Sequence, residues 1–127
     1  MTDNIPDIIK EVGFDFSWDE KKVWALNEPV TEMYISELEW HFDVPFLWEN
    51  GVYNLTPREV INNSLAHAKE YKRTMASDIS YPIDIMENKG RWLILDGLHR
   101  LMKLNIQGID KLQVRKIPRD RIPEILK

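Results

Sequence analysis

The stretch from residue 83 to residue 117 constrains the fold most, because two runs of strand-forming residues are followed directly by a helix whose start and end are both marked by the sequence. A turn-type sequence ending at Gly90 joins the two runs, since glycine readily adopts positive φ. Gly108 marks the end of the helix. The expected elements are strands at 83–86, 91–95 and 112–117 and a helix from 98 to about 107. The stretch therefore predicts a hairpin, a helix and another strand in succession.

Three serine or threonine residues, each with a glutamate three positions later, have the spacing of helix-starting capping boxes. They are Ser17, Ser36 and Thr56. Thr56 gives the strongest signal because Pro57 occupies the first helical position, and its helix is expected to reach about residue 78 with a break near 62–64. The remaining expected elements are a strand at 30–35, a short helix ending at Pro45 and a helical turn after Pro118.

This order of elements predicts an α+β fold, with a small mixed β-sheet flanked by helices. We expect a helical lead-in at 1–27 followed by the main body at 28–127, the two forming one compact domain. The chain has 127 residues, of which 43% are hydrophobic, enough for a single core. It has no cysteine, which excludes disulfides, thiolate metal sites and cysteine nucleophiles.

Charge and hydropathy bear on partners and location. No apolar run approaches the roughly 18 residues that span a bilayer, and the first residues are acidic where a signal peptide is basic. We therefore expect a cytoplasmic protein with no membrane contact. The net charge is −4, although residues 111–127 carry six basic side chains against two acidic ones. Such an acidic body argues against nucleic acid as a partner.

The residues that carry chemistry are Asp96, Gly97, Leu98, His99 and Arg100, where a buried strand turns into a helix. Gly97 allows a sharp turn and close approach of a ligand. The first N–H groups of the helix lie at the positive end of its dipole, which attracts anions. His99 and Arg100 add phosphate donors, and Asp96 could hold a phosphate-bound Mg²⁺ or accept a proton. Lone Asp-Gly pairs are also common as simple turns and caps, so that structural explanation stays open.

Other side chains could join this site. Lys103 lies one turn after Arg100 and could reach a phosphate, although an exposed lysine is the default expectation. Acidic and imidazole candidates occur after the first expected strand, at Glu37, Glu39, His41 and Asp43. Of these Glu39 is the catalytic candidate, with a helix-capping role as its alternative. The Trp-rich stretch 40–53 offers either a stacking wall for a base, core packing or a contact surface for a protein partner.

Residues 80–117 carry a pattern seen in a known superfamily. The matching segments are Tyr81-Pro82-Ile83 before the hairpin, Asp-Gly-Leu-His-Arg at 96–100, the helix end at 106–109 and Val114-Arg115 in the last strand. The segment resembles the ParB/sulfiredoxin superfamily, which shares an Asp-Gly-x-His-Arg box in this context. The resemblance covers about a third of the chain well, and the part from residue 30 to residue 45 less closely.

The resemblance implies a nucleotide site. In sulfiredoxin-like and free-serine-kinase-like members the helix start and the His-Arg pair bind ATP or ADP phosphates, and partition proteins bind CTP there. By position, Gly97, Leu98, His99 and Arg100 match the phosphate-binding residues and Asp96 matches the kinase-like acid. A second acid in the kinase-like relatives follows the first strand, where Glu37 or Glu39 stands here.

Departures from the pattern limit what carries over. Leu98 stands where sulfiredoxin has its cysteine, so that activity is excluded. The Arg-rich box of partition proteins is lacking and no helix-turn-helix segment follows in this sequence, so we do not expect a DNA clamp. Some relatives are described as nucleases, and Asp96 with His99 could support metal-assisted hydrolysis.

The leading hypothesis is a nucleotide-binding domain that uses ATP or ADP, or CTP, together with Mg²⁺, as a phosphotransferase on a small hydroxyl compound. Asp96, His99 and Glu39 are its catalytic candidates, with Asp96 also the metal ligand. Residues 97–100 and Lys103 are the nucleotide-binding candidates. Two alternatives stay open: a non-catalytic regulatory module that binds a protein through 40–53, and a ParB-like nuclease.

Overall fold

The computed structural model describes residues 5–127, and its centre is a four-stranded mixed sheet. The strands lie in the order β1 (Val30–Tyr34), β4 (Lys111–Lys116), β2 (Ile83–Asn88) and β3 (Arg91–Asp96). Both outer pairs are antiparallel, whereas β4 and β2 in the middle run parallel. The chain between that parallel pair passes through β3 and helix α5 (Leu98–Ile106), which supply the crossover. The predicted α+β fold with a small mixed sheet is confirmed.

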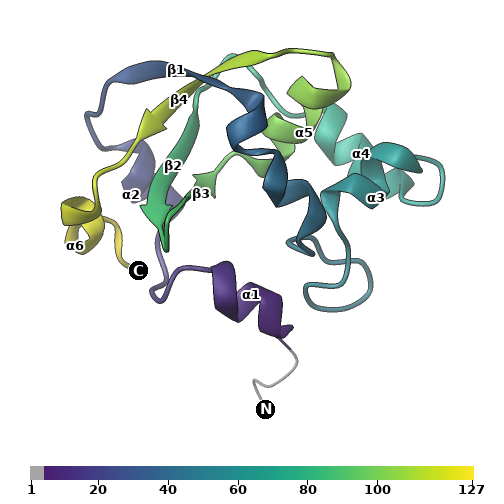
Figure 1. The fold of residues 1–127 in the computed structure, drawn as a ribbon, viewed down its shortest axis with the longest axis horizontal. Helices are drawn as coiled ribbons and strands as arrows, with labels where there is room; N and C mark the ends of the chain where they lie inside the picture. Colours follow the sequence, from purple (N-terminus) through teal and green to yellow (C-terminus); the bar gives the residue numbers. More distant parts are fainter. Residues whose placement is uncertain (1–4) are drawn as a thin grey trace.

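The other helices are short and lie around this sheet (Figure 1). They are α1 (Asp7–Val12), α2 (Glu20–Trp24), α3 (Pro57–Asn62), α4 (Ala68–Met75), α6 (Ile122–Ile125) and the 3₁₀ turns η1 (Ile35–Glu37), η2 (Glu39–Asp43) and η3 (Arg119–Arg121). Helices α3, α4 and α5 contact one another on one side of the sheet, and α2 contacts α6 on the other (Figure 1). Between residues 5 and 127, no helix combines the length and apolar character needed to cross a bilayer.

Three apolar clusters hold these parts together, the smallest formed by Ile9 and Val12 of α1 with Val44. The largest one joins the sheet to α5 and to the 3₁₀ turns through buried side chains that include Leu38, Phe42, Ile83, Leu101 and Val114. The second surrounds Met86 and takes in Val23 of α2 and Ile125 of α6. Because α2 belongs to this second cluster, the described part of the N-terminal lead-in packs onto the sheet and contributes to the core.

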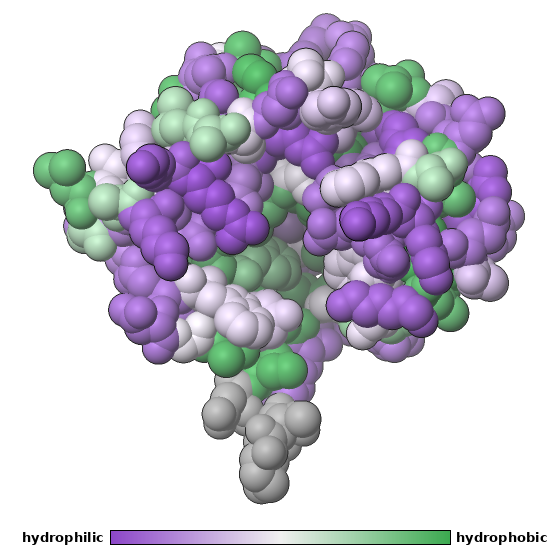
Figure 2. Space-filling view, turned by 180° about the vertical axis from the view of Figure 1, so that it is seen from behind, coloured by the Kyte–Doolittle hydropathy of each residue, from purple (hydrophilic) through white to green (hydrophobic). Residues whose placement is uncertain are grey.

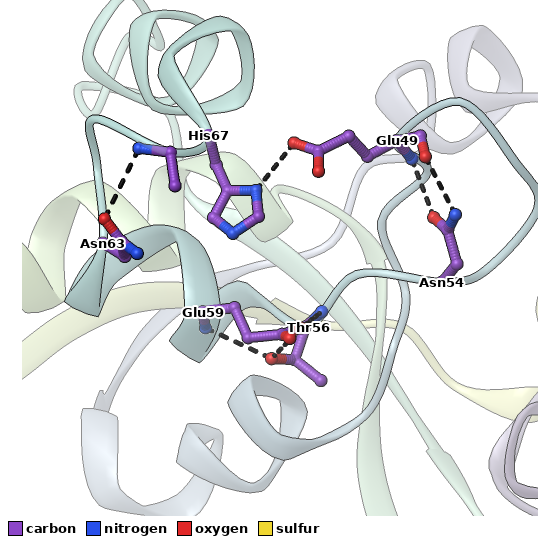
Figure 3. A network of polar contacts seen from close by, with 7 residues as sticks. Glu49, Asn54, Thr56, Glu59, Asn63 and His67 are labelled. Carbon is purple, nitrogen blue, oxygen red and sulfur yellow. Dashed lines mark hydrogen bonds and ion pairs between the residues drawn. The ribbon is translucent and has the colours of Figure 1, made fainter.

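Several local predictions are confirmed by the backbone. Thr56 caps α3 in a reciprocal box with Glu59, with Pro57 at the first position (Figure 3). The predicted break near 62–64 is real, because α3 ends at Asn62 and α4 begins only at Ala68. Gly90 and Gly108 have φ of 83° and 74°, as the hairpin turn and the helix stop require.

The other two capping boxes are wrong. The helix expected to start at Ser17 is capped by Asp19, whose carboxylate accepts from the Lys21 N–H. The short helix expected from Ser36 is replaced by η1 and η2, and neither has a side-chain cap. Buried side chains recur there every third residue, at Ile35, Leu38 and His41. A 3₁₀ turn, with three residues per turn, places all three toward the core, which explains the difference.

A β-bulge precedes the candidate loop. Asp84 pairs with Asp96 and Ile85 pairs with Ile94, so Leu95 is an extra residue on β3. The carbonyl of Leu95 accepts a hydrogen bond from Trp18 Nε1 at 3.0 Å. The bulge therefore changes the direction of the end of β3. The Trp18 indole supplies a hydrogen bond to the Leu95 carbonyl, which has no partner in the irregular strand pairing.

Candidate functional site

The turn from β3 into α5 depends on Gly97. Its φ of 119° and ψ of 20° lie in a region that residues with a side chain rarely adopt. A Cβ at this position would also lie 3.1 Å from Ile83 Cγ1 and 3.4 Å from Arg100 Cζ. No side chain caps α5, whose axis begins at Leu98. The N–H groups of its first turn are therefore left for water or a ligand.

Asp96 is held in place by hydrogen bonds from two side chains, one on α2 and one on α5. Its Oδ2 accepts from Trp24 Nε1 at 2.8 Å and from Arg100 Nη2 at 2.5 Å. Arg100 Nη1 donates to the carbonyl of Pro82 at 2.6 Å. We expected the Arg100 guanidinium to bind a phosphate through two parallel hydrogen bonds. It instead donates to two groups of the protein itself. In this arrangement Arg100 orients Asp96 and anchors the loop to the start of β2.

His99 is paired with a residue that the sequence did not indicate. Its Nε2 lies 2.8 Å from Glu70 Oε2 on α4, and the two side chains are 20% and 13% exposed. A carboxylate only accepts, so Nε2 carries the proton and Nδ1 is the basic nitrogen of the neutral ring. Nδ1 makes no hydrogen bond to the described residues. Glu70 therefore fixes the tautomer of His99 and leaves one ring nitrogen available.

A cleft of about 780 Å³ lies in front of this loop. The space-filling view from behind shows a hollow in the middle of the molecule, with a largely hydrophilic rim and hydrophobic residues in its depth (Figure 2). The basic side chains that line the cleft are Lys10, Arg73, Arg100 and Lys127, and the acidic ones are Glu20 and Asp96. Gly97, Leu98 and His99 also line it. A net acidic protein thus presents a locally cationic cleft at the start of α5.

His41 lines the same cleft but both of its ring nitrogens are already used. Nδ1 donates to the carbonyl of Leu38 at 2.8 Å, and Nε2 accepts from the N–H of Ile94 at 3.2 Å. Burial lowers the pKa of His41 to about 4, and the charge of Arg91 adds to that lowering. His41 is therefore a neutral tether between η2 and the outer edge of β3.

The remaining predicted residues lie elsewhere. Glu39 is half-buried on η2, and the cleft is lined by its neighbour His41 but not by Glu39. Lys103 donates from Nζ to the carbonyl of Ser77 at 2.9 Å and does not line the cleft. Asp43 forms an exposed ion pair with Arg58. The structure thus brings Asp96, Gly97, Leu98, His99 and Arg100 together at one cleft and leaves Glu39 and Lys103 outside its lining.

Three residues of the site were missed by sequence reasoning: Glu70, Arg73 and Trp24. Glu70 and Arg73 sit one turn apart on α4, where alternating charges look like an ordinary solvated helix face. Trp24 reaches Asp96 from 72 positions away. No short-range pattern marks any of them, because each acquires its role only through tertiary packing.

Carboxylate and imidazole groups elsewhere do not form a ready metal centre. Within residues 5–127 no three or more Asp, Glu or His side chains are grouped to hold a metal ion. Asp96 alone could serve a Mg²⁺ that arrives with phosphate oxygens as its other ligands. The chain has no significant match among protein-family models, curated proteins or solved structures.

Proposed function

We propose that this chain is a nucleotide-binding domain whose phosphate site is the start of α5. The observation that carries the proposal is the uncapped helix start at Gly97–Leu98, facing a cleft with four basic and two acidic side chains. Helix dipole, free N–H groups and an excess of cations all favour a polyanion at one place. The volume of about 780 Å³ suits a ligand of nucleotide size.

Aromatic side chains in the same cleft support a ligand that also has a flat base. Phe46 and Tyr53 line one part of the cleft, and Phe14, Phe16 and Trp18 line another. The last three contact one another with ring centroids 5.0–5.9 Å apart. Stacking of a nucleobase on such rings is worth about 1–3 kcal/mol. Base and phosphates would therefore each find a suitable surface.

Arg73 is the guanidinium best placed for the phosphates. Its side chain is 70% exposed and lines the cleft, and its nearest acidic partner, Glu70, is 4.0 Å away. Arg100 also lines the cleft, but its two terminal nitrogens are bonded to Asp96 and Pro82. We therefore assign the charge-neutralising role to Arg73 and a positioning role to Arg100.

The reaction that suits this arrangement is transfer of a phosphoryl group from ATP to a small hydroxyl compound. Phosphoryl transfer relies on placement and on stabilisation of charge more than on covalent chemistry. Arg73 and the helix start would stabilise that charge, and Asp96 would share a Mg²⁺ with the phosphates. The ParB/sulfiredoxin resemblance agrees with a nucleotide at this loop. ADP and CTP are alternative ligands of the same site.

A second candidate function is a binding module for a protein partner. It is favoured by Trp48 in the Trp-rich stretch, which is 54% exposed, with Val52 also exposed nearby. A module of that kind would not need a nucleotide.

Thermal unfolding with and without ligand tests the proposal. Mg²⁺ with ATP, ADP or CTP should raise the unfolding temperature, because a ligand at 100 times its Kd adds about 2.7 kcal/mol to the native state. Arg73→Gln should weaken ATP binding about tenfold. Lys72→Gln is the matched control, because it removes the same charge from the same helix at a position that does not line the cleft. A wild-type protein that shows no shift with any of the three nucleotides at millimolar concentration would refute the proposal.

A further inference from the structure

A second cavity, of about 820 Å³, adjoins the cleft. The two share Phe46, Arg73 and His99 in their linings. His99 therefore lies where a molecule in the cleft and a molecule in the second cavity would meet. No other histidine lines both spaces.

The second cavity combines apolar walls with several polar side chains. Besides the shared residues, its polar lining comes from Glu49, Asn50, Lys69 and Glu70, and its apolar lining from Leu47, Trp48, Ala66 and Ala68. Glu49 is fixed by a hydrogen bond between its carboxylate and His67 Nδ1 at 2.7 Å and by two hydrogen bonds between its backbone and the Asn54 amide (Figure 3). Such a cavity suits a small polar molecule that carries hydroxyl groups, or water.

Glu70 gives His99 the geometry of a general base. The Glu70 carboxylate accepts a hydrogen bond from His99 Nε2 at 2.8 Å, so Nε2 keeps its proton. Nδ1, which has no hydrogen-bond partner among the described residues, is then the nitrogen that can take up a proton. The resulting imidazolium would stay paired with the carboxylate. Arg73 Nη1 lies 4.0 Å from Oε1 of the same Glu70 carboxylate. The other charged side chains that line a cavity together with His99 are Lys10, Glu20, Asp96, Arg100 and Lys127 in the cleft and Glu49 and Lys69 in the second cavity.

We propose that His99 is the general base of this site, that Glu70 is its positioning residue, and that the attacking hydroxyl or water approaches from the second cavity. The inference rests on the proposed nucleotide site. The attacking oxygen forms a bond to the γ-phosphorus of a nucleoside triphosphate while the bond to the bridging oxygen breaks. The bonding pair leaves with the diphosphate, and the proton of the attacking group passes to His99 Nδ1.

The test uses water as the attacking group and follows phosphate release from Mg²⁺-ATP by the full chain. His99→Ala should lower the rate about 100-fold or more, the usual contribution of a general base, and should leave the Kd for ATP within about threefold. Glu70→Gln should lower the rate about tenfold with the same Kd. The double variant should be no slower than His99→Ala alone, because residues that act as a unit are not additive.

Chemical rescue separates a base from a structural residue and also tests the route. Added imidazole should restore at least a tenth of the lost rate to His99→Ala, since it can occupy the vacated space. With ATP filling the cleft, imidazole must enter through the second cavity. Ala68→Trp places a large side chain in that cavity and should prevent the rescue of His99→Ala. Lys72→Trp on the same helix, outside both cavities, is the matched control and should not prevent it.

Each outcome has one meaning. ATP binding without phosphate release, or a His99→Ala variant that keeps the wild-type rate, would overturn the general-base assignment and leave the nucleotide site standing. Rescue that persists with Ala68→Trp would overturn the route through the second cavity. Absence of ATP binding in the wild-type protein would instead refute the nucleotide site itself.

Discussion

The segment around His41 and the loop around His99 line one cleft, yet they hold their histidines in different ways. The His41 ring is bonded through both nitrogens to backbone groups, Leu38 O and Ile94 N. The His99 ring is bonded through one nitrogen to a carboxylate. An imidazole with both nitrogens occupied stabilises the fold, whereas one with a free nitrogen and a carboxylate behind it can exchange a proton. The number of occupied nitrogens therefore distinguishes a histidine that only holds the fold together from one with a nitrogen free to exchange a proton.

Replacing each histidine by alanine gives the largest expected contrast. His41→Ala should lower the free energy of unfolding by about 3–4 kcal/mol, because it empties a buried site and leaves the Leu38 carbonyl and the Ile94 N–H without their partner. His99→Ala should cost about 1 kcal/mol or less, since Glu70 lines the second cavity and water there can bind its carboxylate. Urea unfolding at pH 7 measures both. Equal losses would show that the two segments do not differ as described.

The second prediction concerns the effect of low pH on the free energy of unfolding, which should be dominated by the buried His41. Burial lowers the pKa of His41 in the native protein to about 4, whereas in the unfolded chain the pKa is near the ordinary histidine value of 6.5. As the pH falls from 6.5 to 4, the unfolded chain binds a proton at this residue and the native protein does not. The free energy of unfolding therefore decreases, by about 3 kcal/mol in total from this group.

Urea unfolding at pH 7 and pH 4.5 measures that decrease. The His41→Gln variant cannot titrate at this position, so its stability should fall by less than that of the wild type over the same interval. An identical fall in both proteins would mean that His41 does not stay neutral in the native state.

The elements from residue 83 to residue 108 could be predicted because their signals are local. Gly90 and Gly108 adopt the positive φ that their turn and helix stop require, and both strands and α5 lie where periodicity placed them. The sequence also predicted that the loop from Asp96 to Arg100 forms one site, and all five residues line the same cleft. These features depend on backbone preferences over a few residues, which one sequence displays directly.

The partners of that loop could not be predicted, because they come from distant segments. Glu70 is 29 positions from His99, and Trp24 is 72 positions from Asp96. Their side chains look like ordinary helix-surface residues until α4 and α2 are packed against the sheet. The hydrogen bonding of Arg100 within the protein could not be predicted either, since one of its acceptors is the carbonyl of Pro82, which precedes β2. Local signals thus locate the loop, and tertiary packing decides what each side chain is free to do.

The smallest expected effect concerns the backbone of the loop itself, which differs from the His41 segment in depending on a glycine. Gly97→Ala should lower the free energy of unfolding by about 2 kcal/mol, because a side chain at φ 119° is strained and its Cβ would press on Ile83 at 3.1 Å. Gly90→Ala is the matched control: its φ is also positive, at 83°, but a Cβ there meets nothing within 4 Å, so about 1 kcal/mol is expected. Urea unfolding of both variants isolates the contact with Ile83 from the cost of the backbone angle. Equal losses would show that Ile83 yields freely, and that the start of α5 is not fixed by close packing against β2.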